Sequence, residues 1–421
     1  MKYKTYKIKD LINEISMGPF GSNIKVECFV DSGIPVLNGS NLTGFALNDN
    51  SFRYVTPEKA DSLGKANAYR GDIVITHRGT LGQIVFIPEN SKYSRYVISQ
   101  SQFRVKCNEK VLPEYLVYYF HTNAGQHRLL SNASQVGVPA LARASTTFQT
   151  LEIDIPDVTE QRKIVDLLET IREKIELNNA INNNLEQQAR LLFKSWFVDF
   201  EPFNGTMPSD WEVVPFETIV DFQNGYAFKS KELLNEPSSD CYQVFKQGHI
   251  ARGGGFIPNG TKSWYPKKLA SKLEKFVLKK GDILMAMTDM KDNVAILGNT
   301  AIMPIENEYI VNQRVGHLRA NGYKGITYPF IYLLTNSTDF LIDLRSRANS
   351  GVQVNLSSAE IKASQTVLPS EKVNTAFSEI TLSMFEAIIS NQLENQRLAQ
   401  LRDTLLPKLM SGELDVSDID L

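Results

Sequence analysis

The sequence predicts an α+β protein in which two similar globular α/β domains are separated by two long antiparallel helices that form a coiled coil. Three observations lead to this fold class. A segment of roughly 210 residues is repeated in the sequence. In each copy, short β-rich runs alternate with turns, and a heptad pattern follows them. The chain has 421 residues, and single hydrophobic cores stop growing near ~250–300 residues. Several domains are therefore expected.

The repeat is visible as matched segments at a nearly constant offset. Gly71–Ile75 recurs as Gly281–Met285, which is 281 − 71 = 210 positions later. Tyr96–Gln100 recurs as Tyr309–Gln313, which is 309 − 96 = 213 positions later. This period far exceeds the ~20–50 residues of solenoid repeats. We interpret it as a duplicated module that is half globular and half helical.

Each globular half contains short runs of β-forming residues separated by Gly, Pro and Asn turns. These runs predict strands at Asp72–Thr76, Gln83–Ile87, Phe103–Lys106, Asp282–Met287 and Ala301–Ile305. Two further segments, Pro113–Phe120 and Tyr328–Leu334, read as short helices that begin near a proline. Each half is therefore classed as α+β.

The first long helix is expected from Glu160 to about Phe200, because no proline or glycine interrupts this stretch. Asp157 and Glu160 fit a capping box, and Thr159 is a competing N-cap. Spacing of 4-3-4-3 gives the heptad seam Ile164, Leu168, Ile171, Ile175, Asn178, Asn182, Leu185, Ala189, Leu192 and Trp196. The second helix has Ser370 as its N-cap, and 213 positions later the seam reads Phe377, Thr381, Met384, Ile388, Asn391, Asn395, Leu398, Arg402, Leu405 and Leu409.

Both seams carry two asparagines at their centre. Antiparallel pairing of the helices would place Asn178 near Asn395 and Asn182 near Asn391, with the two globular domains at opposite ends. Buried asparagine lowers stability but fixes the register, because a slipped pairing leaves amides without partners. A helix of ~40 residues is ~60 Å long and needs a partner along its seam. The alternative is that the two amphipathic helices belong to separate cores.

The repeat and the helices together predict four segments. Residues 1–150 form the first globular domain and residues 151–205 the central long helix. Residues 206–368 form the second globular domain, and residues 369–421 form the distal long helix and tail.

Formal charge alternates along the chain, although the total is only −2. Residues 1–150 hold 17 basic and 11 acidic side chains (net +6), and residues 151–210 hold 6 and 12 (net −6). Residues 211–368 hold 18 and 15 (net +3), and residues 369–421 hold 4 and 9 (net −5). One interpretation is that the basic segments face a polyanion; the other is chance combined with helix composition. Two similar basic domains at a fixed distance suit duplex DNA with a split target.

Four motifs, in this order, resemble a known family over essentially the whole chain. They are the strand motif Gly71–Gly79 with its partner Gly281–Thr288; Ile155-Pro156 followed by Glu160–Ile164; Leu191–Phe197; and Leu405–Gly412. On these residues the chain resembles the specificity (S) subunit of type I restriction–modification systems. One departure is that the second helix entry, Pro369–Lys372, lacks the Glu-Gln pair of the first.

The resemblance implies a DNA-binding subunit without catalytic activity of its own. Each target-recognition domain would read one half of a bipartite, asymmetric site in double-stranded DNA. The helices would set the unread spacer and dock two modification (M) subunits, which bind S-adenosylmethionine and methylate adenine. Restriction (R) subunits would add ATP-driven translocation and cleavage. The resemblance thus implies no cofactor on this chain, with S-adenosylmethionine, ATP and Mg on the partner subunits.

Motifs for chemistry of the chain's own were sought as alternatives. The sequence has no Asn-Pro-Pro-aromatic tetrapeptide and no GxxxxGK[ST] loop, and its five histidines lack metal-ligand spacing. Two alternatives stay open: a methyltransferase or nuclease with an unrecognised active site, and a coiled-coil scaffold that carries two non-DNA ligand modules. The three scattered cysteines and the absence of an apolar run near ~18 residues favour a reduced cytoplasm and no membrane.

Loops of both domains should supply the DNA contacts, because phosphates attract cations and base edges are read by forked donors. The DNA-binding candidates are His77, Arg78, Lys92, Arg95 and Arg143 in the first domain, and Arg252, Lys262, Trp264, Lys267, Lys268, Lys291 and Asn293 in the second. For each residue the alternative is an ordinary solvated surface side chain. Gly71-Asp72 and Gly281-Asp282 are interpreted as structural turns, and Gln100 and Gln313 as structural because they recur.

Overall fold

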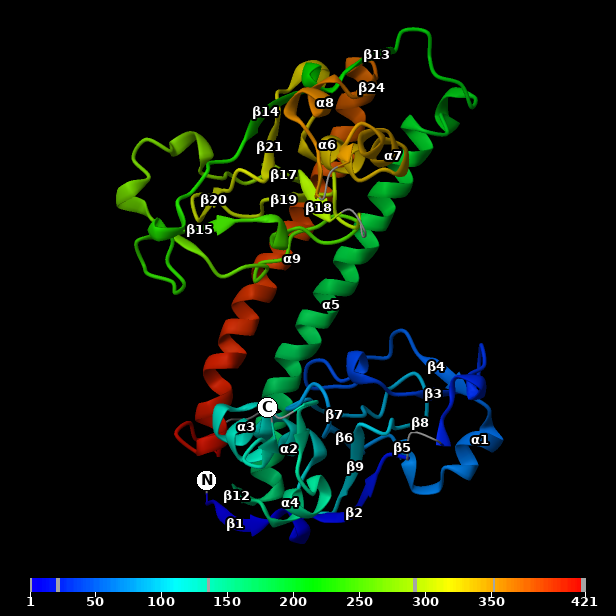
Figure 1. The fold of residues 1–421 in the computed structure, drawn as a ribbon, viewed down its shortest axis with the longest axis vertical. Helices are drawn as coiled ribbons and strands as arrows, with labels where there is room; N and C mark the ends of the chain where they lie inside the picture. Colours follow the sequence, from blue (N-terminus) through cyan, green and yellow to red (C-terminus); the bar gives the residue numbers. More distant parts are fainter. Residues whose placement is uncertain (1, 20–22, 135–136, 291–293, 351–352, 418–421) are drawn as a thin grey trace. The chain divides into compact units, whose positions relative to one another are not determined.

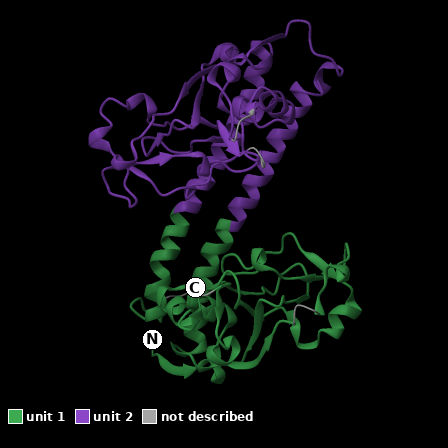
Figure 2. Cartoon of the chain, viewed as in Figure 1, with its two compact units in different colours: residues 1–175, 397–421 green, residues 176–396 purple. Residues whose placement is uncertain are grey.

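The computed structural model describes residues 2–19, 23–134, 137–290, 294–350 and 353–417. Its Cα positions divide into two compact units, coloured green and purple in Figure 2. Unit 1 comprises residues 1–175 and 397–421, and unit 2 comprises residues 176–396. Each unit therefore contains one globular domain and part of both long helices. None of the described helices combines the length and hydropathy needed to span a membrane.

Unit 1 is built on short sheets whose strands come from distant parts of the sequence (Figure 1). A four-stranded antiparallel sheet has the order β2 (Ile12–Met17), β9 (Gln102–Cys107), β6 (Ile73–Thr76) and β7 (Ile84–Phe86). A second sheet has the order β4 (Arg53–Val55), β3 (Ile34–Val36), β8 (Arg95–Val97) and β5 (Asn67–Tyr69). Two ribbons pair β1 (Lys4–Lys7) with β12 (Glu152–Ile155) and β10 (Ala133–Ser134) with β11 (Ala140–Leu141).

Four short helices complete the first domain. They are α1 (Pro57–Ser62), α2 (Pro113–His121), α3 (Asn123–Leu129) and α4 (Ala144–Thr150). Helix α2 starts on Pro113, whose fixed φ suits the first helical position. The helix and the strands predicted for this domain are confirmed to within two residues at each end.

Unit 2 repeats the same plan. Its four-stranded sheet has the order β14 (Val220–Asn224), β21 (Val315–Ala320), β17 (Ile283–Ala286) and β19 (Thr300–Ile302). The second sheet has the order β16 (Trp264–Pro266), β15 (Cys241–Phe245) and β20 (Tyr309–Val311). Strand β13 (Glu212–Pro215) pairs with β24 (Gln365–Leu368), and β18 (Thr288–Met290), β23 (Gln353–Asn355) and β22 (Asn349–Ser350) form a small sheet. The helices are α6 (Tyr328–Thr335), α7 (Thr338–Ser346) and α8 (Ser358–Ala363).

The two domains also share the same sheet directions. In each, the second sheet contains one parallel pair, β3 with β8 in unit 1 and β15 with β20 in unit 2. In each, the first strand of the domain pairs antiparallel with the last, which closes the domain before a long helix begins. The duplication inferred from the sequence is therefore a duplication of topology.

Both Gly-Asp motifs are structural turns, as predicted. Gly71 and Gly281 have φ of +80° and +84°, a region that glycine enters without steric cost. Asp72 Oδ2 accepts from the Tyr69 amide at 2.9 Å, and Asp282 Oδ2 accepts from the Lys279 amide at 2.7 Å. Both carboxylates are only 2% exposed.

The matched glutamines behave differently from the Gly-Asp turns. Gln100 and Gln313 both have exposed side chains. Their backbones make contacts inside the domains: Gln100 O lies 3.1 Å from His77 Nε2, and the Gln313 amide donates to Tyr226 O at 2.9 Å. A structural role therefore belongs to their backbone groups and not to their side chains.

The long helices are α5 (Val158–Phe197) and α9 (Glu371–Ser411). Asp157 Oδ1 accepts from the Glu160 amide at 3.0 Å, so Asp157 rather than Thr159 caps α5. Helix α5 ends three residues before the predicted Phe200, and α9 starts directly after Ser370.

The ends of both helices are built into the domain cores, so they are more than a spacer. In unit 1, Ile164 and Leu168 of α5 and Leu409 of α9 are fully buried in the core that contains α2. In unit 2, Phe197 of α5 and Phe377 of α9 lie in the core that contains α6, with ring centroids 4.8 Å apart. The two antiparallel helices are present as predicted, and in addition each domain uses part of both helices as core.

Asparagine pairs join α5 and α9 within unit 2. Asn178 Nδ2 donates to Asn395 Oδ1 at 2.9 Å and to Glu394 Oε2 at 2.7 Å. Asn391 Nδ2 donates to Asn182 Oδ1 at 2.9 Å. Residue numbers rise along one helix as they fall along the other, so the helices are antiparallel as predicted. Asn178 is 1% exposed, and a slip in register would leave its amide without these partners.

Candidate nucleic-acid interface

Three of the candidates in the first domain meet where two loops join. An isolated β-bridge pairs Arg78 with Ala140, and the Leu141 amide donates to His77 O at 2.9 Å. Arg143 follows this bridge and precedes α4, with φ of +47°. The side chains of Arg78 and Arg143 are exposed. This edge of unit 1 therefore presents two exposed arginines on adjoining segments of the backbone.

His77 is held by packing and hydrogen bonding. Its Nε2 lies 3.1 Å from Gln100 O, and its ring centroid is 6.3 Å from that of Phe103. Burial lowers the pKa of His77. The imidazole is therefore neutral near pH 7 and does not add a cation beside Arg78.

Lys92 and Arg95 lie at the second sheet of unit 1. Arg95 Nη2 is 2.7 Å from Asp61 Oδ1, and Nε donates to Asn67 Oδ1 at 2.8 Å. These bonds occupy the guanidinium within the domain, which favours the structural alternative for Arg95. Lys92 is exposed, with its ammonium 5.4 Å from the centroid of Tyr93.

In the second domain, a cluster of candidates surrounds strand β16, at the edge of its sheet. The side chains of Lys262, Lys267 and Lys268 are exposed, and Trp264 is half-buried at the start of the strand. The Lys267 ammonium lies 5.2 Å from the ring centroid of Tyr242 on the neighbouring strand. Cations interleaved with aromatic rings suit a phosphate backbone with accessible bases. Lys291 and Asn293 lie outside the described residues.

Arg252 lies elsewhere in unit 2, on the loop that joins Ile250 to Phe256. Its side chain is exposed, and the glycines that follow it, Gly253–Gly255, have φ of +78°, +100° and +113°. Three successive residues with positive φ can adopt this path without strain only as glycine. The loop therefore has no side chains of its own, after Arg252, with which to hold its conformation.

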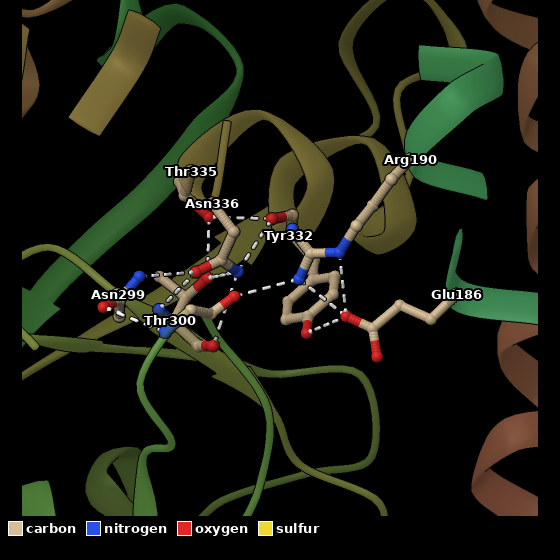
Figure 3. A network of polar contacts seen from close by, with 8 residues as sticks. Glu186, Arg190, Asn299, Thr300, Tyr332, Thr335 and Asn336 are labelled. Atoms are coloured by element: carbon tan, nitrogen blue, oxygen red, sulfur yellow. Dashed lines mark hydrogen bonds and ion pairs between the residues drawn. The ribbon is translucent and has the colours of Figure 1, made fainter. Parts of the chain in front are cut away.

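A buried polar network lies beneath this loop (Figure 3). Asn336 Oδ1 accepts from the Thr300 amide at 3.0 Å, and Asn336 Nδ2 donates to Thr300 Oγ1 at 2.6 Å. Thr335 Oγ1 lies 2.8 Å from Thr300 Oγ1, and Asn299 Nδ2 donates to Asn336 Oδ1 at 3.3 Å. The network joins the end of α6 to strand β19. Its buried groups are paired, which fixes the floor under the loop.

The sequence reasoning missed this network and the helix residues that contact it. Arg190 of α5 donates to Glu186 Oε1 and to Gly253 O, and Glu186 Oε1 also accepts from Tyr332. The Glu186–Arg190 spacing of four residues was an available signal for an ion pair on one helix face. The contact with Gly253 joins residues far apart in the sequence, so periodicity gives no sign of it.

The described residues contain no cluster of three or more His, Cys, Asp or Glu side chains placed to hold a metal ion. The polar groups that face solvent on the loops above are instead cations, amides and aromatic rings. Their chemistry suits recognition of an anionic polymer.

Two domains of one topology, each with exposed basic side chains on its loops and each sharing two paired helices, define a duplicated recognition protein. The model of the type I restriction modification DNA specificity domain matches this chain twice, over residues 2–187 and 208–403. The chain belongs to this family.

Relatives of known class resemble the chain along most of its length. The HindI type I restriction enzyme specificity subunit of Haemophilus influenzae is 24% identical over 446 residues, which cover 88% of this chain and 93% of the relative. The MjaIX specificity subunit of Methanocaldococcus jannaschii is 25% identical over 434 residues, covering 98% and 94%. The crystal structure of a type I S subunit from M. genitalium has a TM-score of 0.59 at 18% identity, covering 97% and 96%. That structure shares the fold.

Proposed function

We propose that the chain is the non-catalytic, sequence-reading subunit of a type I restriction–modification complex. Each domain reads one half of a bipartite, asymmetric site in double-stranded DNA. The observation that carries this proposal is the duplicated recognition domain, matched twice by the family model and repeated in units 1 and 2 with the same order in its four-stranded sheet and the same pairing of first and last strands. Two readers of one plan with different loops suit a target whose halves differ.

The exposed basic side chains support contact with DNA at both domains. Arg78 and Arg143 offer forked donors, the groups that pair with guanine edges or with phosphates. The lysines around β16 offer point charges, which fix position on the backbone rather than sequence. The first domain is thus suited to base reading at this edge, and the second to backbone contact at β16 with base reading elsewhere.

The long helices are suited to contacts with protein partners. Leu177, Ile181 and Leu191 of α5 are 56%, 40% and 66% exposed. Large apolar side chains exposed along one helix are typical of protein–protein interfaces. The net charge of −6 over residues 151–210 also disfavours a phosphate contact. We therefore assign α5 and its repeat α9 to docking two M subunits, with R subunits joining the assembly.

We assign the chemistry, and S-adenosylmethionine, ATP and Mg with it, to the partner subunits. The test is to incubate the isolated chain with labelled S-adenosylmethionine and DNA. No label should be transferred until M subunits are added. Methyl transfer by the chain alone would contradict a non-catalytic role.

The methylated motifs of the source genome test the proposed function directly. A split adenine motif should be present when the gene is intact and absent when it is deleted. Complementation with the intact gene should restore the same motif. An unchanged methylome after deletion would contradict the proposal.

A further inference from the structure

Helix α5 contacts the loop that carries Arg252. Arg190 Nη2 donates to Gly253 O at 3.0 Å and to Glu186 Oε1 at 2.7 Å, and Arg190 Nε donates to the same carboxylate oxygen at 3.1 Å. Tyr332 of α6 donates from its hydroxyl to Glu186 Oε1 at 2.8 Å. Figure 3 shows these three side chains facing one another beside the buried Asn336 network. The loop is therefore tied to a helix that begins in the other repeat of the sequence.

The guanidinium of Arg190 is held in one pose. Its fork is fixed by two bonds to Glu186, and its central carbon lies 5.8 Å from the ring centroid of Tyr332. Burial and the Glu186 carboxylate raise the pKa of Tyr332, so the phenol stays protonated and continues to donate to Glu186. A lysine has no planar fork and could not make the same set of bonds.

The opposite side of the loop rests on the polar network. The Gly253 amide donates to Asn299 Oδ1 at 3.4 Å, and the Gly255 amide donates to Thr300 O at 3.0 Å. A Cβ at Gly254 would lie 2.7 Å from Asn336 Cγ, so the backbone is packed directly on that side chain. Arg190 and the network thus hold the loop from two sides. The loop also has backbone bonds of its own, from the Ala251 amide to Gly255 O at 2.9 Å and from the Gly254 amide to Ala251 O at 3.1 Å. Because glycine backbones have the largest conformational freedom, the external contacts add to these bonds in holding the loop pose.

We propose that Arg190 is a positioning residue for the Arg252 loop, so that readout of one DNA half-site depends on a bond from helix α5. The inference rests on the proposed function, because it takes the loop to face DNA. The Arg190 side chain donates a hydrogen bond to the backbone carbonyl of Gly253, which is the residue next to Arg252. Loss of that bond frees the loop without removing any side chain that faces the target. Helix α5 also carries the apolar residues assigned to partner docking. One helix therefore contacts both the proposed partner and the Arg252 loop.

The test uses the full chain with its M subunits and measures methylation of a duplex with the native motif. The same rate is measured on duplexes with one base pair changed in either half. Selectivity for a half-site is the methylation rate on the native duplex divided by the rate on the duplex with a changed base pair in that half. Arg252→Ala should lower the selectivity for one half-site, and that half-site is then assigned to the Arg252 loop. Arg190→Ala should lower selectivity at least tenfold in that half and leave the other half unchanged. Arg190→Lys should fall between wild type and Arg190→Ala.

Tyr332→Phe is the matched control, because it removes the hydroxyl bond to Glu186 and leaves the Arg190–Gly253 bond in place. Its selectivity should stay within twofold of wild type. Hydrogen exchange provides a second readout that needs no DNA: the amides of Gly253 and Gly255 should exchange at least tenfold faster in Arg190→Ala. A merely structural role would instead lower activity equally on both halves.

Three outcomes overturn the inference. They are unchanged loop exchange in Arg190→Ala, equal loss of selectivity in both halves, and no half-site effect of Arg252→Ala. If the wild-type complex shows no sequence-selective methylation at all, the proposed function fails, and this inference fails with it. If wild type is selective and Arg190→Ala is indistinguishable from it, only the inference fails.

Discussion

The two domains use the same turn with different chemistry at its end. In unit 1 the 3-10 turn Gly39–Asn41 ends on Asn41, whose Oδ1 accepts from the Asn38 amide at 3.0 Å. In unit 2 the turn Gln247–His249 ends on His249, whose Nδ1 accepts from the Lys246 amide at 3.1 Å. Both end residues are fully buried. One copy of the repeat thus holds its turn with an amide and the other with a titratable ring.

The contacts that the long helices make with loops of the two domains also differ in chemistry. In unit 1, Arg402 of α9 stacks over Phe45, with its guanidinium carbon 5.0 Å from the ring centroid. In unit 2, Arg190 of α5 forms a hydrogen bond with the backbone of Gly253. The duplicated architecture therefore keeps an arginine from a long helix against a domain loop, while the type of contact differs. The shared scaffold is separable from the local chemistry, and each prediction below tests one such difference.

The largest expected difference concerns the buried carboxylates of the Gly-Asp turns. Burial raises the pKa of Asp72 despite Arg104. Burial also opposes the charge of Asp282, but bonds from Arg319 and His317 outweigh it and hold its pKa below the usual range. Asp282→Asn should therefore cost about 1–3 kcal/mol, because it removes a carboxylate whose charge is favoured by bonds from Arg319 and His317. Asp72→Asn should cost less, because burial outweighs the pairing of Asp72 with Arg104 and its charge is less favoured in the folded state.

Native-state hydrogen exchange measures the two losses separately, with β17 and β21 reporting on unit 2 and β6 and β9 on unit 1. The Asp72→Asn variant is the control for Asp282→Asn. Equal losses in the two domains would show that the difference in pairing does not matter for stability.

Acid should weaken unit 2 through His249. Burial lowers the pKa of His249 to about 4, whereas the unfolded chain titrates near ~6.5. As pH falls from ~6.5 to ~4, the His249 imidazole becomes protonated in the unfolded state but stays neutral in the folded state. Stability is therefore complete above ~6.5 and falls by up to about 3 kcal/mol at the lower limit.

His249→Asn reproduces the residue that unit 1 uses at this turn. It should reduce the acid dependence of hydrogen exchange in β15 and β20 relative to wild type. The variant and wild type must be compared within unit 2, because burial also lowers the pKa of His77 and His121 in unit 1. An acid dependence that is unchanged in the variant would contradict the role of His249.

Within unit 1, Arg78 and Arg95 should separate sequence reading from stability. Arg78→Ala should weaken binding to the intact site, by ~1–3 kcal/mol and with relaxed specificity at one position if it reads guanine. Arg95→Ala should leave specificity unchanged, because its guanidinium is bound to Asp61 and Asn67. Binding measured against single-base variants and against salt distinguishes them. An unchanged salt slope together with unchanged specificity would remove Arg78 from the interface.

The helices shared by the two units should set the spacer of the DNA motif. Insertion of four residues into each helix between its core segments adds ~6 Å, at 1.5 Å per residue. One base pair spans ~3.4 Å, so the preferred spacer should change by one or two base pairs. The methylated motif of the variant reports the change. A methylated motif with its original spacer would show that the helices do not set the spacer length.

Most of the fold was predictable because it depends on periodicity and on the repeat. The heptad seams predicted both helices, and the asparagines predicted the register because a slipped pairing leaves their amides without partners. The burial of Phe197 and Phe377 in a domain core was not predicted, since a seam pattern does not distinguish a coiled-coil partner from a core.

The candidate site was less accessible to sequence reasoning, because charge alone does not show which cations are already paired. Arg95 is bound by Asp61, which lies 34 positions away, and Arg190 reaches Gly253 across 63 positions. Neither contact follows a helix or strand period. Arg78 and Arg143 are exposed at one edge, and the backbone pairing around Arg78 and Ala140, which no sequence period predicts, brings their loops together. Whether the candidates contact DNA stays a prediction.

The central claim is that each domain reads one half of the target, and exchange of the domains tests it most directly. A chain in which a second copy of residues 1–155 replaces residues 206–368 keeps both long helices and the closing strand β12, and it has two identical readers. Expressed with M subunits, it should direct methylation to a motif whose two halves carry the same sequence, that of the first half of the native motif. Retention of the native asymmetric motif by this chain would contradict the account.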